Sequence, residues 1–152
     1  MRSKQERLDA IRQVIEARDI STQEELIAEL EKLGHEVTQA TVSRDIGELG
    51  LLKVKVVNSS RGRQVYSLPE IERLRSMLSE FMISIDRAGN LIVVKTTPGT
   101  AQAVASAIDA AKWADVLGTV GGDDTVLIIT RDENVGSYIV GRLMRLSKEK
   151  TV

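Results

Sequence analysis

The sequence has no cysteine, and its 152 positions include only one histidine, two prolines and four aromatic residues. Without cysteine there can be no disulfide, thiolate metal site or cysteine nucleophile. Because aromatic rings are so few, the hydrophobic cores must be aliphatic, and binding of RNA or single strands by base stacking is disfavoured. No apolar run is long enough to span a membrane, and the charged start Met-Arg-Ser-Lys-Gln-Glu-Arg is not a signal peptide. These absences predict a soluble, cytoplasmic protein with no membrane partner.

Patterns typical of enzymes are missing as well. The chain contains no Gly-x-Ser-x-Gly motif and no phosphate-binding loop, and no histidine lies near a nucleophile. The single histidine, His35, follows a glycine and is expected in a surface turn. The sequence therefore predicts a binding protein with no catalytic residues, no metal and no cofactor.

The composition is that of a folded protein, with 42% hydrophobic and 28% charged residues and a net charge of −1. Such a charge gives no overall attraction to nucleic acid, but the segment 43–64 is locally basic. It contains two carboxylates, Asp45 and Glu48, and five cations, Arg44, Lys53, Lys55, Arg61 and Arg63. A basic edge on a neutral domain suits DNA, although an ordinary solvated charge cluster is the usual explanation of such runs.

The N-terminal half, residues 1–69, has the pattern of three helices and a hairpin. Apolar spacing predicts a helix over 7–18, and the capping-box sequence Ser21-Thr-Gln-Glu24 opens a second helix that ends at Gly34. Its apolar stripe is Leu26, Ile27, Leu30 and Leu33. After a third helix over 38–50, alternating segments at 52–57 and 63–68 predict a β-hairpin. This order is that of a winged helix-turn-helix domain, which binds double-stranded DNA.

The third helix has an unusual outer face. Thr38 is a good N-cap and Gly50 is placed to end the helix, while Val42, Ile46 and Leu49 share the side that would face a core. The other side carries Arg44 between Ala40 and Gly47. Gly47 costs about 1 kcal/mol relative to alanine, which suggests that close approach to a flat partner such as a DNA major groove matters. An ordinary surface helix remains the alternative.

The C-terminal half has a different pattern. Pro69 and the charged segment 70–75 mark a boundary, and residues 70–81 are expected to form a linking helix. From residue 82 to 152 the expected elements are strands at 82–86, 91–96, 116–120 and 125–130 and helices at 100–112 and 133–146. This order predicts an α+β sandwich, an antiparallel sheet with helices on one face, with a strand-turn-helix unit that occurs twice. The last helix is apolar on more than one side, which favours burial in an oligomer.

The segment Gly118-Thr-Val-Gly-Gly-Asp-Asp-Thr125 places two carboxylates in a glycine-rich turn. Three interpretations compete: an ordinary hairpin turn, a metal site, or a site for a cationic organic ligand held by charge-assisted hydrogen bonds. A metal would need further ligands, which the pattern does not supply. If the preceding helix packs against the turn, Gln102 and Asp109 could add polar groups.

Three stretches resemble the bacterial arginine repressor family, in order along nearly the whole chain. They are Ala40-Thr-Val-Ser-Arg-Asp-Ile46 with Glu48-Leu-Gly-Leu51, Thr97-Pro-Gly-Thr-Ala-Gln102, and Gly118 to Thr125. The resemblance implies a transcriptional regulator of arginine biosynthesis and catabolism, with L-arginine as co-repressor. It also implies trimers formed by the C-terminal domain, and two trimers stacked into a hexamer with arginine between them.

The resemblance also implies roles for particular residues. The candidate DNA contacts are Gln39, Ser43, Arg44, Lys53, Arg61 and Arg63, of which the last three would meet phosphates. The candidate L-arginine ligands are Gln102, Asp109, Thr119, Gly121, Asp123 and Asp124. Gly121 replaces the family's usual alanine, which could loosen the turn and weaken binding. Two other hypotheses stay open: a winged-helix regulator that senses another cationic amino acid, and an architectural protein that bends DNA for recombination.

Overall fold

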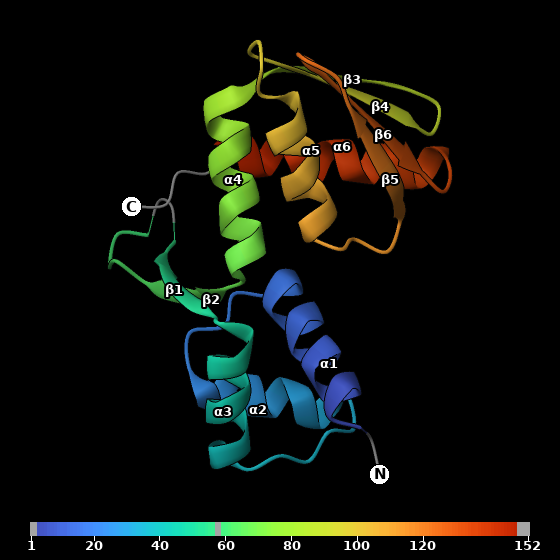
Figure 1. The fold of residues 1–152 in the computed structure, drawn as a ribbon. Helices are drawn as coiled ribbons and strands as arrows, with labels where there is room; N and C mark the ends of the chain where they lie inside the picture. The colour runs from blue at the N-terminus through green and yellow to red at the C-terminus, as the bar shows by residue number, and fades with distance from the viewer. Residues whose placement is uncertain (1–2, 57–58, 149–152) are drawn as a thin grey trace. The chain divides into compact units, whose positions relative to one another are not determined.

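The computed structural model describes residues 3–56 and 59–148. The chain divides between Pro69 and Glu70 into two compact units, which Figure 1 shows in blue to green and in green to red. The predicted ends at residue 57 of the first hairpin strand and at residue 152 of the C-terminal domain lie outside the described residues.

The N-terminal unit consists of three helices and a two-stranded antiparallel sheet. Its elements are α1 (Lys4–Ala17), α2 (Gln23–Lys32), α3 (Gln39–Leu49), β1 (Leu52–Lys55) and β2 (Gln64–Ser67). This order confirms the expected winged helix-turn-helix. Helix α1 begins before the expected residue 7, because the Ser3 hydroxyl caps it by accepting from the Glu6 N–H at 3.1 Å.

The start of α2 differs from the prediction by one residue. Thr22, not Ser21, is the N-cap, and its hydroxyl accepts a hydrogen bond from the Glu25 N–H at 3.1 Å. The Glu25 carboxylate in turn accepts from the Ser21 N–H, also at 3.1 Å. The two bonds satisfy backbone donors in the manner of a capping box. Glu24 was the wrong partner, because Glu25 follows the true cap by three positions.

The core of this unit is aliphatic, as the lack of aromatic residues requires. Ile11, Leu26, Leu30 and Val42 are fully buried. Leu33, which was expected in the apolar stripe of α2 with Leu26 and Leu30, is exposed. The prediction for His35 was wrong as well: its side chain is buried, and its backbone N–H donates to the Leu30 carbonyl at 2.9 Å. Gly34, at φ 87°, turns the chain back over the end of α2 and so places His35 against the core.

The C-terminal unit is an antiparallel sheet with two helices packed on it. Its elements are α4 (Pro69–Phe81), β3 (Met82–Ala88), β4 (Leu91–Thr96), α5 (Ala101–Ala110), β5 (Val116–Gly121), β6 (Thr125–Thr130) and α6 (Glu133–Lys148). The strand order is β3-β4-β6-β5 with every neighbouring pair antiparallel. The expected α+β class and element order are confirmed.

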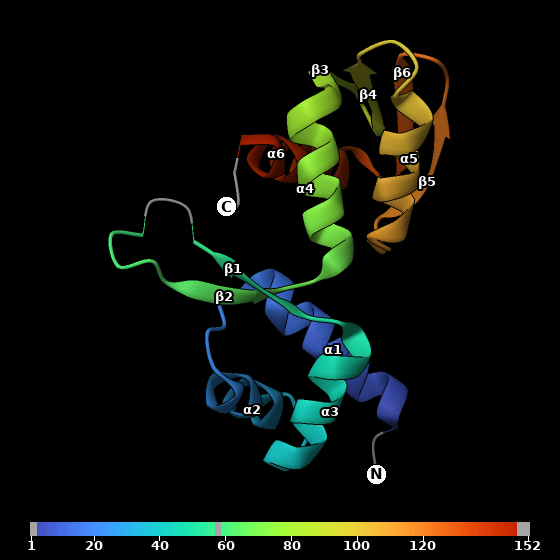
Figure 2. The ribbon, with the colours of Figure 1, turned by 60° about the vertical axis from the view of Figure 1, so that its left-hand side comes forward.

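The helices α5 and α6 lie on the same side of this sheet (Figure 2). On that side Ile92, Val94, Val126 and Ile128 are fully buried. Helix α5 follows β4 in the chain but packs on β5 and β6, while α6 follows β6 and packs mainly on β3 and β4. The repeated strand-turn-helix unit is therefore present, and each helix covers the hairpin of the other repeat.

The opposite face of the sheet is covered by no helix of the described chain. The strand register places on it five apolar residues, of which Leu91 and Val120 are exposed: Leu91, Val93, Val120, Leu127 and Ile129. We call this set the open sheet face. The last helix was expected to be buried in an oligomer, because it is apolar on more than one side. Ile139, Leu143 and Leu146 pack inside the unit, while Tyr138 and Met144 remain exposed, and the oligomer stays a prediction.

Candidate functional sites

Helix α3 presents the expected polar face. Gln39, Ser43 and Arg44 are exposed, and Val42 and Leu49 are buried on the other side. The cap geometry is as predicted: the Thr38 hydroxyl accepts from the Thr41 N–H at 3.2 Å, and Gly50 ends the helix at φ 65°. The helix thus offers a short polar surface with Arg44 near its middle.

Gly47 lies on this outer face with open space around it. A methyl group built on its Cα would meet no atom within 4 Å among the described residues. Packing inside the unit therefore does not require glycine at this position. Glycine weakens a helix interior by about 1 kcal/mol relative to alanine, and the described residues give no packing reason for this cost.

The core side of α3 includes one residue that the sequence did not predict. Ile46, expected on that side, is half-buried, and Asp45 is buried there together with Val42 and Leu49. Arg7 of α1 holds the Asp45 carboxylate with two hydrogen bonds, from Nε at 2.6 Å and from Nη2 at 3.0 Å. The hydrogen bond to Asp45 raises the pKa of the Arg7 guanidinium above its ordinary value. Sequence reasoning missed this pair, although the spacing of Val42, Asp45 and Leu49 follows helical periodicity.

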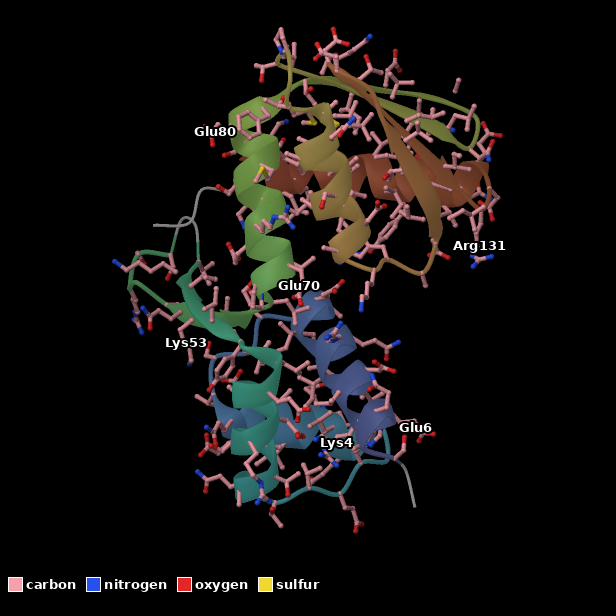
Figure 3. The ribbon with its side chains drawn as sticks, viewed as in Figure 1. Lys4, Glu6, Lys53, Glu70, Glu80 and Arg131 are labelled. Atoms are coloured by element: carbon pink, nitrogen blue, oxygen red, sulfur yellow. The ribbon has the colours of Figure 1, made fainter. Side chains whose placement is uncertain are left out.

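The wing cations are arranged in two ways. Lys53 and Arg63 bind the turn between α1 and α2: Lys53 Nζ donates to the Ser21 carbonyl, and Arg63 donates to the Ser21 hydroxyl at 3.0 Å and to the Asp19 carbonyl at 3.3 Å. Lys53, labelled in Figure 3, also lies 4.3 Å from the centre of the Tyr66 ring. Arg61, by contrast, is exposed in the turn that leads to β2. The structure thus gives Lys53 and Arg63 an internal role in fixing the wing.

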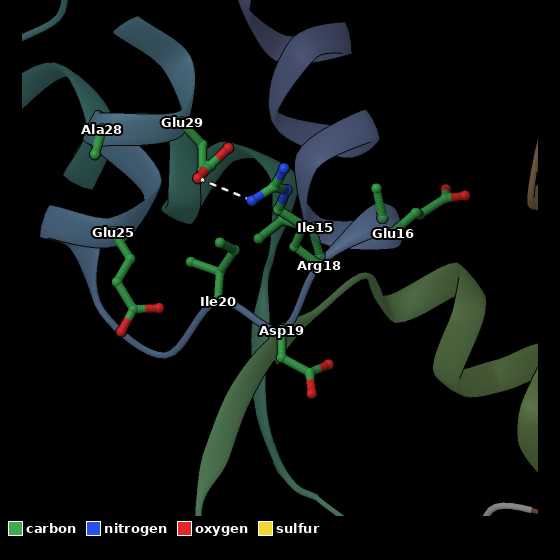
Figure 4. A pocket seen from close by; sticks show the side chains of 9 residues that line it. Ile15, Glu16, Arg18, Asp19, Ile20, Glu25, Ala28 and Glu29 are labelled. Atoms are coloured by element: carbon green, nitrogen blue, oxygen red, sulfur yellow. Dashed lines mark hydrogen bonds and ion pairs between the residues drawn. The ribbon is translucent and has the colours of Figure 1, made fainter. Parts of the chain in front are cut away.

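A hollow of about 630 Å³ lies at the C-terminal end of α1, against α2 (Figure 4). Four acidic residues line it: Glu16, Asp19, Glu25 and Glu29. The Arg18 Nη1 atom lies 3.4 Å from the Glu29 Oε1 atom and forms an ion pair with it. Carboxylates in such number repel phosphate, so this hollow does not suit the DNA backbone. The exposed face of α3 is the better candidate.

Asp123 and Asp124 lie in the turn between β5 and β6, against the start of α5. The Asp123 carbonyl accepts hydrogen bonds from the N–H groups of Gly99 at 3.1 Å and Ala101 at 3.2 Å. These bonds fix the turn to the beginning of the helix. Both carboxylates, those of Asp123 and Asp124, remain exposed.

The other candidate ligand residues line the same helix and strand. Thr119 donates its hydroxyl to the Asp109 carboxylate at 2.9 Å, which joins the later part of α5 to β5. At the other end, a methyl group built on Gly121 would lie 3.2 Å from the Cα of Gln102. Seven residues of helix separate Gln102 from Asp109, about 10 Å along the axis. The structure therefore brings all six candidates to one edge of the unit.

Sequence reasoning missed one neighbour of this edge. Lys95 of β4 donates to the Thr125 hydroxyl at 2.8 Å, and that hydroxyl donates to the Asp124 carboxylate at 3.0 Å. Lys95 and Thr125 are cross-strand partners, so a correct strand pairing would have revealed the contact. Among residues 3–56 and 59–148, Asp124 accepts from the Thr125 hydroxyl, which in turn accepts from Lys95, and no guanidinium bonds to it.

Two further features concern metal ions and membranes. No group of three or more histidine, aspartate or glutamate side chains among the described residues could hold a metal ion. Within the same residues, none of the helices is both long and apolar enough to cross a membrane.

Comparison with known proteins identifies the family. Residues 2–74 match the family model described as "Arginine repressor, DNA binding domain", and residues 78–145 match "Arginine repressor, C-terminal domain". The chain belongs to the arginine repressor family. Members of this family are DNA-binding regulators and not enzymes.

Curated relatives match over almost their whole length. An arginine repressor from an Exiguobacterium species is 45% identical over 93% of this chain and 97% of its own. That of Halalkalibacterium halodurans is 44% identical over 90% and 93%, and that of Carboxydothermus hydrogenoformans is 47% identical over 87% and 91%. The similarity to arginine repressors therefore extends over both units.

Proposed function

We propose that the protein is an L-arginine-dependent repressor that acts in the cytoplasm on the operators of arginine biosynthesis and catabolism genes. Residues 1–69 bind operator DNA, residues 70–81 link the domains, and residues 82–152 bind arginine and form oligomers. The proposed base-reading residues are Gln39, Ser43 and Arg44, and the proposed phosphate contacts are Lys53, Arg61 and Arg63. Exposure of the α3 face beside a helix glycine that no internal packing explains supports this assignment.

The observation that carries the ligand assignment is the exposed carboxylate pair at the start of α5. Asp123 and Asp124 share the edge with Gln102, Asp109 and Thr119, and Gly121 permits the close approach of α5 and β5. A carboxylate can bind a guanidinium by two parallel hydrogen bonds, whereas an ammonium is only a point charge. The edge therefore suits arginine better than lysine or ornithine.

The open sheet face supports the proposal of an oligomer. Its exposed apolar residues need a cover that the described chain does not provide, and a second copy of the chain is the partner that the family resemblance implies. In the proposed assembly, trimers stack with their Gly-Gly-Asp-Asp turns facing one another. Like charges gathered there repel each other, so a bound arginine cation would favour the hexamer.

Isothermal calorimetry of the full chain tests the ligand assignment. We expect L-arginine to bind more tightly than lysine or ornithine, and citrulline to bind poorly because it is uncharged. Asp123→Asn should weaken arginine binding at least tenfold, since charged hydrogen bonds contribute about 1.5–3 kcal/mol. Asp115→Asn is the matched control, because Asp115 is an exposed carboxylate of the same unit outside the edge.

Sedimentation of the same samples at several dilutions provides the second readout. Arginine should shift the distribution from trimer to hexamer, as linkage requires if the hexamer binds it better. Equal binding of citrulline and arginine would reject the carboxylates as the recognition element. Tight arginine binding with an unchanged distribution, at dilutions where both species occur, would reject the coupling but leave the ligand assignment intact.

A further inference from the structure

Two ion pairs join the first turn of α1 to α3. The inner pair is Arg7–Asp45, in which the Arg7 side chain is 20% exposed and the Asp45 side chain 3%. Its two hydrogen bonds are 2.6 and 3.0 Å long. The pair Lys4–Glu48 is outside, at 2.9 Å, with 60% and 49% exposed. Each partner of the outer pair lies three residues from its counterpart in the inner pair, so both pairs lie along the same line between the helices.

Asp45 occupies a place where an aliphatic side chain would be expected. It lies between Val42 and Leu49 on the buried side of α3. Replacement of a buried ion pair by well-packed apolar residues of similar volume is often neutral or stabilising, because desolvation offsets the attraction between the charges. Stability alone is therefore a poor reason for a carboxylate at this position.

An ion pair joined by two hydrogen bonds fixes the relative orientation of its partners, which an apolar contact does not. The guanidinium and the carboxylate are planar, and two parallel hydrogen bonds fix both the distance and the angle between them. An apolar contact tolerates sliding and rotation of the helix by comparison. The Arg7 fork thus holds α3 at one rotation about its own axis.

That rotation determines where Arg44 points. Successive residues of an α-helix are about 100° apart around the axis, so the direction of Asp45 sets that of its neighbour Arg44. Reading a base edge requires a side chain to reach hydrogen-bonding distance with the correct orientation, while a phosphate contact tolerates more freedom. An error in the rotation of α3 should therefore reduce operator recognition more than binding of DNA in general.

We propose that Arg7 and Asp45 are a positioning pair for sequence reading, which orients α3 so that Arg44 discriminates operator from other DNA. The proposal rests on the proposed base-reading role of Arg44. It assigns to residues that touch no DNA base a share of the specificity, expressed as the ratio of the dissociation constants for random and operator duplex.

The test compares stability with discrimination in the same variants. The main variant combines Arg7→Met with Asp45→Leu and so replaces the ion pair by apolar side chains. The second variant, Arg7→Lys, keeps the positive charge but loses the two parallel hydrogen bonds to Asp45. Lys4→Gln is the matched control, because it removes a cation of the outer pair from the same helix. The free energy of unfolding is measured with denaturant. Dissociation constants are measured with arginine, at one salt concentration, on random duplex and on an operator duplex selected from a random library by the wild-type protein.

We expect the double variant to keep a near wild-type free energy of unfolding and to lose about tenfold in the ratio, within the range that loss of one base-reading side chain would give. Arg7→Lys should lose several-fold, and Lys4→Gln should leave the ratio unchanged. A folded double variant with the wild-type ratio would overturn the proposal. If the double variant does not fold, a wild-type ratio in folded Arg7→Lys would overturn it equally.

The same measurements separate this proposal from the assignment of Arg44. Arg44→Ala is measured on both duplexes in parallel. If Arg44→Ala leaves the ratio unchanged, the proposed base-reading role itself fails. If Arg44→Ala lowers the ratio while neither pair variant does, only the positioning role of Arg7 and Asp45 is rejected.

Discussion

The carboxylates of the two candidate surfaces have different partners. On α3, Asp45 and Glu48 form ion pairs with Arg7 and Lys4. On the edge of the C-terminal unit, Asp124 and Asp109 accept hydrogen bonds from threonine hydroxyls and, within the described parts of the chain, form no ion pair. Among the described residues the Asp123 carboxylate has no hydrogen-bond or ion-pair partner, and only its backbone carbonyl is used.

Under the proposed function, this difference distinguishes how the two surfaces would meet their partners. Helix α3 is held by ion pairs inside its own unit, so its polar face would be formed before DNA binds. The carboxylates beside α5 have no cationic partner within hydrogen-bonding distance among the described residues, so a cationic ligand would supply that charge.

The largest expected effect tests whether the two units are separate in energy as well as in structure. Leu30 and Leu143 are fully buried, one in each unit, and truncation to alanine should cost each about 2–5 kcal/mol of unfolding free energy. Trp113, the single tryptophan, lies in the C-terminal unit and reports on it by fluorescence. Leu143→Ala should shift the fluorescence transition in denaturant, and Leu30→Ala should shift the far-ultraviolet circular dichroism while leaving fluorescence in place.

Leu30→Ala and Leu143→Ala serve as controls for each other, because they remove the same atoms from different cores. A fluorescence transition that moves equally in both variants would show that the units unfold as one block. The two surfaces would then depend on one cooperative structure and not on two separate cores.

The next effect concerns Arg44. Arg44→Ala should weaken binding to the operator by about 1–3 kcal/mol, the range of a bidentate base contact, with a much smaller loss on random duplex. Arg61→Gln is the contrasting variant, since a phosphate contact is lost on both duplexes and the dependence of binding on salt becomes less steep. Quantitative binding assays over a range of salt distinguish the two patterns. Equal losses on both duplexes for Arg44→Ala would remove it from the base-reading role.

The smallest effect compares two helix glycines, one in each unit. Gly47→Ala and Gly141→Ala should each raise the free energy of unfolding by about 0.5–1 kcal/mol, because alanine is the better helix former. At both positions the new methyl group meets no atom closer than 3.4 Å among the described residues. If α3 approaches DNA closely, Gly47→Ala should also weaken operator binding, while Gly141→Ala should not. Unchanged operator affinity in a stabilised Gly47→Ala protein would contradict close approach.

Local patterns were sufficient to predict most of the fold. The caps at Thr38 and Gly50 and the bounds of β4 and β6 could be read directly, since they depend on neighbouring residues. The burial of Asp45 was not predicted, because it depends on Arg7 far away in the chain. His35 was misplaced because the turn at Gly34 places it against the core. The same limit applies to Lys95, whose contact with Thr125 depends on strand pairing, and to the internal contacts of Lys53 and Arg63. The six candidate ligand residues came from family resemblance, which carries information that periodicity lacks.

The exchange of helices in the C-terminal unit has a consequence for how that unit can form. Each hairpin is covered mainly by the helix that follows the other hairpin, so one half of the repeat alone would leave most of its apolar surface uncovered. A half-length chain would leave a bare hairpin and a detached amphipathic helix, which are marginal on their own in water. Folding must therefore wait for contacts between distant parts of the chain, which makes the unit cooperative and comparatively slow to fold.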